Sequence, residues 1–447
     1  MWGAPFRGVV TYPPRLQVRL HERGIAEGDE VAIEEEGRTY RGILMPHHAF
    51  SGEDILTLKL GNGYNIGVLA TEKTSITLLG KGTMPTRKVT PPATEEDKPT
   101  VAFLATGGTI ASFVDYRTGA VRPALTAEDL VASVPELGRI CRVRARILFS
   151  LLSENMTPDH WESLAQEVVK ELNGGASGVI IPHGTDTMGF TASALAFQLR
   201  DLPGPVILVG SQRSSDRPSS DAFSNLLAAA RLAMEDLGEV VLLMHDSSSD
   251  HTFAVHRGTK VRKAHTSRRD AFQSVNHPGL GVVTAEGEVR LSSERVLRAT
   301  GPARSIGRFD RDVVLAHFFP GMKPQTLDLL AQGASGLVLA GTGLGHVSSA
   351  LIGRIEILTG RGIPVVISSQ ALHGRVSLKV YETGRDLLKA GAIPGEDLLP
   401  ETAYVKLAWV LGQTRDLEEV RKRMGENIAL ELNPRIPLEQ KESKRGF

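Results

Sequence analysis

The chain has 447 residues, more than a single hydrophobic core usually supports, so we expect two or three domains. Its 51 lysines and arginines balance its 51 aspartates and glutamates, and a chain without net positive charge is not an obvious nucleic-acid-binding protein. The single cysteine, Cys141, excludes an internal disulfide and is typical of a reducing cytosol. No apolar run approaches the roughly 20 residues of a membrane span, and the N-terminus lacks the apolar core of a signal peptide. We therefore expect a cytoplasmic protein without membrane association.

Residues 1–80 predict a small β-barrel. Short β-favouring runs such as 16–20 and 30–33 are separated by glycines, and the Gly-Asn-Gly sequence at 61–63 is typical of a hairpin turn. This spacing favours an SH3-like barrel. Because the segment carries no catalytic constellation, we interpret it as a docking module. Residues 81–100 contain four prolines, many charges and no apolar period, which predicts an extended linker.

From residue 101 onward the pattern alternates between buried strands and amphipathic helices. The runs 179–181, 206–209 and 240–244 are apolar and β-favouring, with helical patterns between them. Such alternation predicts a mostly parallel, doubly wound sheet. A second α/β set begins at Val313. We expect a large α/β domain over 101–290, a connecting segment over 291–310, a smaller α/β domain over 311–435 and a charged tail over 436–447.

Two helices have clear sequence signals. Thr157 followed by Pro158 is typical of the N-cap and the first residue of a helix. Four apolar residues then follow at helical spacing: Trp161, Leu164, Val168 and Leu172. The run 222–237 predicts another helix, ended by Gly238.

Two threonine-rich glycine loops follow buried strands. The first is Thr-Gly-Gly-Thr at 106–109, and the second is His-Gly-Thr-Asp-Thr at 183–187. Gly107 and Gly108 allow the backbone to approach a ligand closely. Because the carboxyl ends of parallel strands meet at one edge of a sheet, we expect Thr109 and Thr185 to converge.

A threonine hydroxyl needs a neighbouring base before it can act as a nucleophile. Asp186 is adjacent to Thr185, and Lys263, from a third segment, is a candidate to remove the hydroxyl proton. Backbone N–H groups of the glycine loops could stabilise an oxyanion. Together these groups predict acyl transfer on an amide. Taken alone, the loop at 106–109 also fits a phosphate-binding loop or a plain turn.

Histidine and aspartate pairs at 245–246 and 250–251 resemble metal ligands. Their spacing fits neither a zinc site nor an EF-hand. We expect them, together with His256, on a polar surface loop, and we predict no metal site.

The segments FLATGGTIA at 103–111 and IPHGTDTM at 181–188 resemble the two signature segments of the bacterial-type L-asparaginase/glutaminase family. Lys263 falls at the family's active-site lysine. Further segments resemble the family as well: 153–158, 205–213 and 221–226. The resemblance spans residues 100–435 and implies the family's body of one large and one smaller α/β domain.

The resemblance implies a role for each matching residue. Thr109 and Thr185 are the two nucleophile candidates, and Lys263 would polarise or deprotonate Thr185. Asp186 would bind the α-amino group of the substrate, and Ser153 would hold its α-carboxylate.

Three further positions have counterparts in the family. Tyr116 lies, by its spacing after the first loop, where the family has a flexible-loop tyrosine, and Gly108 lies in a substrate-binding loop. The family also receives an acidic residue from a neighbouring subunit, for which Glu382 is the candidate match.

Stand-alone asparaginases lack a counterpart of residues 1–100. A β-barrel, a linker and an asparaginase-like body resemble the layout of the D subunits of archaeal-type glutamyl-tRNA(Gln) amidotransferases, and Leu152, where many cytoplasmic asparaginases carry aspartate, also favours them. This resemblance implies a glutaminase whose ammonia passes to a separate E subunit. That partner would use ATP and Mg²⁺ to amidate Glu-tRNA(Gln), so no cofactor is expected in this chain. It also implies a homodimer that joins two E subunits in a heterotetramer.

Two other functions fit the same residues. One is a free-standing cytoplasmic L-asparaginase with an accessory barrel, which would hydrolyse asparagine strongly without a partner. The other is a non-catalytic module that uses the cleft between its α/β domains to sense an amino acid.

Overall fold

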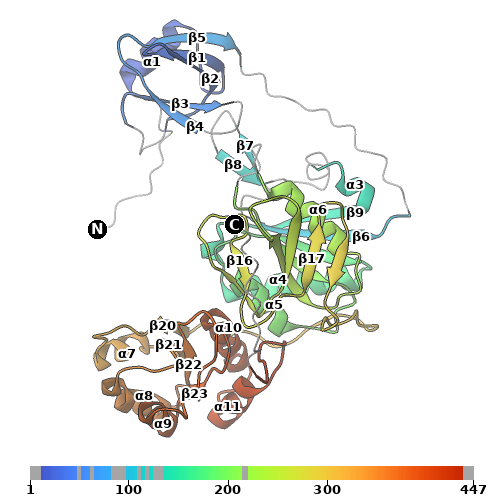
Figure 1. Ribbon diagram of the computed structural model, residues 1–447, viewed down its shortest axis with the longest axis vertical. Helices are drawn as coiled ribbons and strands as arrows, with labels where there is room; N and C mark the ends of the chain where they lie inside the picture. The colour runs from blue at the N-terminus through green and yellow to red at the C-terminus, as the bar shows by residue number, and fades with distance from the viewer. Residues whose placement is uncertain are drawn as a thin grey trace.

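The computed structural model describes residues 12–47, 52–60, 65–81, 97–107, 112–115, 120–123, 134–213 and 220–435. The described residues form an N-terminal β unit, a large α/β domain and a smaller α/β domain at the opposite end of the molecule (Figure 1). No helix in this part of the chain is both long and apolar enough to cross a bilayer.

The N-terminal unit is an antiparallel sheet in the order β4-β3-β2-β1-β5, covered by one helix. Its elements are α1 (Pro14–Glu22), β1 (Glu30–Glu35), β2 (Arg38–Leu44), β3 (Ile55–Leu60), β4 (Asn65–Leu69) and β5 (Ser75–Gly80). The prediction that residues 16–20 form a β-strand is wrong, because these residues lie in α1. A proline in the first turn favours the helix, and Leu16 and Leu20, four residues apart, are buried on one helical face.

The large domain is built on a sheet of eight strands, β18-β17-β14-β13-β12-β10-β6-β9. The five parallel strands are β6 (Thr100–Gly107), β9 (Arg142–Leu151), β10 (Gly178–Pro182), β12 (Val206–Val209) and β13 (Val240–His245). Three antiparallel strands extend one edge: β14 (Thr252–Arg257), β17 (Gly281–Thr284) and β18 (Val289–Leu291). The parallel sheet is therefore confirmed, and the antiparallel edge is an addition to the prediction.

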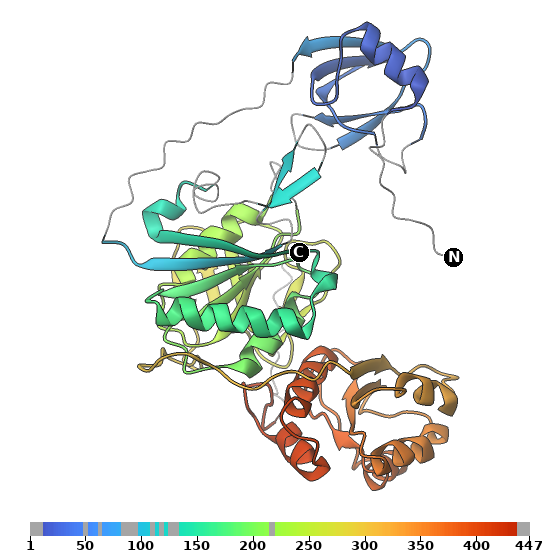
Figure 2. The same cartoon turned by 180° about the vertical axis from the view of Figure 1, so that it is seen from behind.

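Helices cover both faces of this sheet. The helices are α3 (Leu137–Ile140), α4 (Pro158–Asn173), α5 (Met188–Gln198) and α6 (Ala222–Leu232). In β10, Ile180 packs with the core that includes α3 and α6, whereas Val179 and Ile181 pack with the core that includes α4 and α5. Figure 2 shows α4 lying along its face of the sheet. The shorter strands of this region are β7 (Ser112–Asp115), β8 (Ala120–Pro123), β11 (Leu199–Arg200), β15 (Val261–Lys263), β16 (Phe272–Ser274) and β19 (Arg304–Ser305).

The helix at 158 begins where the sequence predicts. Thr157 and His160 form a reciprocal capping box, and the four predicted apolar residues are buried. The helix at 222 ends at Leu232, five residues earlier than predicted. Gly238 has a different role, since a Cβ there would collide with the carbonyl oxygen of Leu297.

The surface-loop prediction is wrong for His245 and His256. Both are buried side chains in the paired strands β13 and β14. Nδ1 of His245 lies 2.8 Å from Oδ1 of Asn225, and its Nε2 lies 2.9 Å from Oδ1 of Asp250. Among the described residues no group of three or more potential metal ligands gathers.

The smaller domain is a four-stranded parallel sheet flanked by helices. Its strands are β20 (Val313–His317), β21 (Gly336–Gly341), β22 (Val365–Ser369) and β23 (Ile393–Pro394). Its helices are α7 (Pro324–Leu330), α8 (Ile352–Gly360), α9 (Glu382–Lys389), α10 (Pro400–Leu411) and α11 (Leu417–Gly425). Helix α10 packs against α5 of the large domain, and the rings of Phe197 and Trp409 stack 6.2 Å apart. A shared apolar core therefore joins the two α/β domains.

Candidate active site

Lys263 brings two of the predicted site residues together. Its Nζ lies 2.8 Å from Oγ1 of Thr185 and 2.8 Å from Oδ1 of Asp186. Thr185 lies in the loop that follows β10, at the carboxyl edge of the parallel strands, and Lys263 ends β15. The lysine side chain is 15% exposed and the aspartate side chain 70%, so the cluster is open to solvent on the aspartate side. A hydroxyl in contact with an amine at the carboxyl edge of a parallel sheet can be activated as a nucleophile.

Ser153 lies directly against the loop that carries Thr185. It begins the short 3-10 helix η2 (Ser153–Asn155) and is buried. A Cβ added to Gly184 would stand 2.8 Å from the Cβ of Ser153, so only glycine fits there. Thr187 adds a second link, because its Oγ1 donates to the carbonyl oxygen of Ser153 at 2.6 Å. The predicted carboxylate-binding residue and the predicted nucleophile loop are therefore neighbours.

The start of the first threonine-glycine segment is anchored to the end of β10, just before the second. Oγ1 of Thr106 donates to the carbonyl oxygen of Pro182 at 3.1 Å. Gly107 has φ +114°, and a Cβ there would collide with the backbone of Leu151, so this residue must be glycine. Gly108, Thr109 and Tyr116 lie outside the described residues, so the convergence of Thr109 on Thr185 and the substrate-binding roles of Gly108 and Tyr116 stay predictions.

Gly210 is a site residue that the sequence interpretation missed. It follows β12, and a Cβ there would stand 2.7 Å from Cγ2 of Thr185. Its carbonyl oxygen accepts a hydrogen bond of 2.9 Å from Nδ2 of Asn225. The buried carboxylate of Asp221 also accepts from the backbone N–H groups of Gln212 and Arg213. These contacts fix residues 210–213 beside the threonine, and only the position of Gly210 after an apolar strand could have suggested this.

His183 is a second residue without an assigned role in the prediction. It is 1% exposed, and its ring nitrogens contact the carbonyl oxygen of Gly184 and Oγ1 of Thr191 at 2.7 and 2.9 Å. Burial lowers the pKa of its imidazole to about 4. The ring is therefore neutral at physiological pH.

Glu382 is the exposed first residue of α9 in the smaller domain. Its predicted contribution to the site of a neighbouring subunit is not tested by a single chain and stays a prediction.

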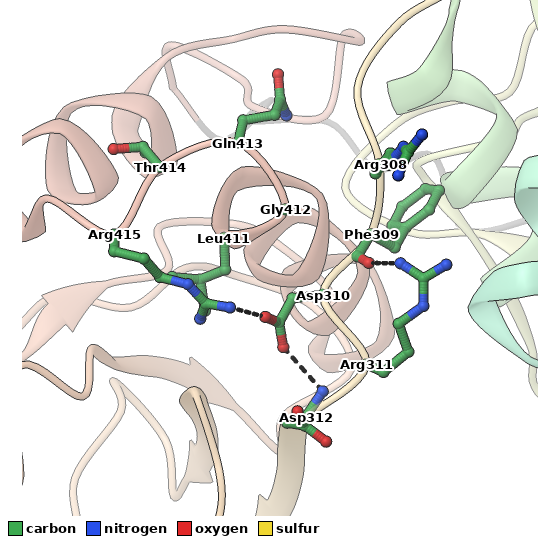
Figure 3. A pocket seen from close by; sticks show the side chains of 10 residues that line it. All are labelled: Arg308, Phe309, Asp310, Arg311, Asp312, Leu411, Gly412, Gln413, Thr414 and Arg415. Atoms are coloured by element: carbon green, nitrogen blue, oxygen red, sulfur yellow. Dashed lines mark hydrogen bonds and ion pairs between the residues drawn. The ribbon is translucent and has the colours of Figure 1, made fainter.

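A pocket of about 490 Å³ lies apart from these residues, between the connecting segment and the turn after α10 (Figure 3). The carboxylate of Asp310 accepts from Arg415 and from the backbone N–H of Asp312. Arg311 pairs with Asp159 and Glu162. Because these charges are paired within the chain, we assign no ligand to the pocket.

Acid is expected to destabilise the large domain. Burial lowers the pKa of three histidines to about 4: His183, His256 and His277. Their stabilising contribution is complete above the unfolded-state pKa of about 6.5 and is lost as pH falls toward 4, because only the unfolded chain then takes up these protons. At pH 5 the loss reaches up to about 2 kcal/mol for each histidine. Urea unfolding followed by tryptophan fluorescence at pH 7.5 and 5.0 measures this loss of unfolding free energy.

The variant His256→Gln serves as the matched comparison. It removes one titrating group and should reduce the pH dependence of the unfolding free energy. An unfolding free energy that stays constant between pH 7.5 and 5.0 in the parent chain would contradict the prediction.

Comparison with known proteins places all three units in described families. Residues 100–297 match the asparaginase N-terminal family, and residues 312–424 match the glutaminase/asparaginase C-terminal domain. Residues 25–79 match the GatD N-terminal domain. These matches follow the three units of the structure along the chain.

Named relatives match nearly the whole chain. The D subunit of the glutamyl-tRNA(Gln) amidotransferase of Pyrococcus furiosus is 47% identical over 428 residues, which cover 94% of this chain and 98% of that protein. The protein of the same name from Methanosarcina mazei is also 47% identical, covering 91% of this chain and 98% of the relative.

Solved structures of L-asparaginases match about three quarters of the chain. The thermostable L-asparaginase from Thermococcus kodakarensis superposes with a TM-score of 0.67 at 35% identity, covering 75% of this chain and 99% of that one. A probable cytoplasmic L-asparaginase from Campylobacter jejuni gives a TM-score of 0.62 at 28% identity, covering 73% and 99%. The predicted asparaginase-like fold class is confirmed. The chain therefore belongs to the family of glutamyl-tRNA(Gln) amidotransferase D subunits.

Proposed function

We propose that this chain hydrolyses the side-chain amide of glutamine and supplies the ammonia to a partner subunit that converts Glu-tRNA(Gln) to Gln-tRNA(Gln). The observation that carries the hydrolytic part is the 2.8 Å contact between Nζ of Lys263 and Oγ1 of Thr185. Family membership supports the amidotransferase part, because relatives 47% identical over more than nine-tenths of this chain are named as subunits of that enzyme.

In the proposed reaction, Oγ1 of Thr185 attacks the amide carbon while Lys263, in its neutral form, takes the hydroxyl proton. The proton is returned to the leaving nitrogen, so ammonia departs and an ester to Thr185 remains. Water then hydrolyses the ester to glutamate and restores the hydroxyl. Thr109 is the other candidate for the first attack, and backbone N–H groups of the two loops would stabilise the oxyanion.

Substrate binding uses the residues around this pair. The exposed carboxylate of Asp186 would hold the α-ammonium of glutamine, and Ser153 its α-carboxylate. Gly108 and Tyr116 would complete the substrate site.

The remaining units serve the assembly in this proposal. The N-terminal unit docks the E subunit, which uses ATP and Mg²⁺ and makes most of the tRNA contacts, so this chain holds no cofactor. Two copies of the chain form a homodimer within a heterotetramer, in the cytoplasm. The zero net charge of the chain supports a division of labour in which the partner binds most of the tRNA.

Ammonia release from glutamine and from asparagine, with and without an E-type partner, ATP and Glu-tRNA(Gln), tests the proposal. We expect slow glutamine hydrolysis by the chain alone and a rise when all three are added. A chain that lacks residues 1–80 should keep the slow hydrolysis and lose the rise. Equal, fast release by the isolated chain would contradict the proposal.

Two other outcomes would identify the alternatives. Strong asparagine hydrolysis without a partner would support a free-standing L-asparaginase, which the likeness to the Thermococcus kodakarensis L-asparaginase makes a specific competitor. Glutamine binding without ammonia release under every condition would support an amino-acid sensor.

A further inference from the structure

We propose that His183 is a positioning residue that fixes the peptide unit between Gly184 and Thr185. The proposal rests on the proposed function, because it takes Thr185 as the reacting hydroxyl. The buried side chain of His183 lies beside the pair formed by Thr185 and Lys263 but does not belong to that pair.

The hydrogen bonds of His183 can run in only one direction when its ring is neutral. Nδ1 lies 2.7 Å from the carbonyl oxygen of Gly184, which can only accept, so Nδ1 carries the hydrogen. Nε2 is then an acceptor, and it lies 2.9 Å from Oγ1 of Thr191. That hydroxyl accepts in turn from the indole N–H of Trp161 at 3.1 Å, a group that can only donate. The hydrogen bonds in this series therefore all run in one direction, from Trp161 through Thr191 and His183 to Gly184.

The anchored carbonyl sets the direction of the next N–H. In a trans peptide the C=O and N–H groups point to opposite sides. With the Gly184 oxygen directed at the buried imidazole, the N–H of Thr185 faces away from it.

Gly184 makes such an anchor necessary. Ser153 occupies the space of a side chain at this position, so the residue must be glycine. Glycine restrains its backbone less than any other residue. The hydrogen bond from His183 supplies the restraint that a side chain would otherwise give, immediately before the threonine.

The residues that hold His183 through this series of hydrogen bonds lie in rigid elements. Trp161 belongs to α4 and Thr191 to α5, and both side chains are buried. The ring of Trp161 also packs edge-on against Phe309 at 5.4 Å. The imidazole is thus held by two packed helices, as a positioning group requires.

Four variants separate positioning from a merely structural role. His183→Leu removes both hydrogen bonds, whereas His183→Asn places an amide N–H near the position of Nδ1. Thr191→Val keeps the shape of the side chain and removes the hydroxyl. Ser193→Ala is the matched control, because its buried hydroxyl on the same helix contacts the Gly258 carbonyl and Thr402, away from His183.

Steady-state glutamine hydrolysis by the full chain, corrected for the folded fraction, gives the readout. We expect kcat to fall roughly a hundredfold for His183→Leu, because the buried Gly184 carbonyl loses its donor, and roughly tenfold for Thr191→Val, because Nε2 of His183 loses its donor. KM should change less than about threefold. His183→Asn should recover roughly tenfold of the loss, and Ser193→Ala should stay within about twofold of the parent. Nitrogen-15 NMR of the histidines should show His183 as the neutral Nδ1–H tautomer from pH 5 to 8.

A folded His183→Leu chain with parental kcat would overturn the proposal, as would a His183 that carries its hydrogen on Nε2. If His183→Leu does not fold, Thr191→Val and the tautomer decide. Failure of the proposed function looks different, because the parent chain would then release no ammonia from glutamine under any condition.

Discussion

Replacing Thr185 with valine is expected to lower glutamine hydrolysis by roughly a thousandfold or more, because the attacking oxygen is lost. Valine keeps the branched shape, and Cγ2 of Thr185 packs so closely against Gly210 that a Cβ there would stand 2.7 Å from it. The change therefore removes the acceptor of the Lys263 hydrogen bond with little effect on packing. Ammonia release by the purified chain measures the effect.

The variant Thr185→Ser is the matched control. It retains a hydroxyl that Lys263 can reach and should keep activity within about tenfold of the parent. If the valine variant were as active as the parent, the nucleophile would have to be sought in the other candidate, Thr109.

Replacing Lys260 with methionine is expected to lower the free energy of unfolding by about 3–5 kcal/mol. Nζ of Lys260 lies 2.7 Å from Oδ2 of Asp397 in the smaller domain, and both side chains are 1% exposed. Among the described residues, the hydrogen bonds left to the carboxylate without the lysine are those from the side-chain amide and backbone N–H of Asn433. Burial lowers the pKa of the Lys260 ammonium, and the nearby Asp397 opposes that shift. Urea unfolding of the parent and the variant measures the loss.

Removing both charges tests the cause. The double variant Lys260→Met with Asp397→Asn should recover much of the lost stability, because no uncompensated charge stays buried. Arg304→Ala breaks an exposed pair with Asp201 and should cost less than about 1 kcal/mol. A Lys260→Met chain as stable as the parent would show that this pair does not hold the two domains together.

The sequence predicted the elements best where one periodicity dominates. Apolar runs identified the parallel strands, and Thr157 with Pro158 located the start of α4. The run 16–20 misled because Leu16, Val18 and Leu20 alternate with polar residues as in a strand. Within α1, Leu16 and Leu20 are buried but Val18 is 56% exposed. Two periods compete in so short a run, and packing against the sheet decides between them.

The site was predictable only through its chemically distinctive residues. Thr185, Asp186 and Lys263 stand out because the residue types suit amide chemistry, and the structure brings them into contact. The role of His183 depends on Thr191 and Trp161, which lie on two other elements, and Gly210 lies against Thr185 from another strand. A single sequence carries no local signal for such contacts.

The contacts between Ser153 and the 184–187 loop bear on the length of substrate that the site accepts. Packing at Gly184 and the hydrogen bond from Thr187 make the serine and the loop one rigid unit. If Ser153 holds the α-carboxylate as proposed, the span from that group to the hydroxyl of Thr185 is fixed. Glutamine and asparagine differ by one methylene along this span, a difference worth about 1–3 kcal/mol in a well-fitted pocket. Discrimination between the two amino acids would then depend on the contacts that hold η2 against the loop after β10.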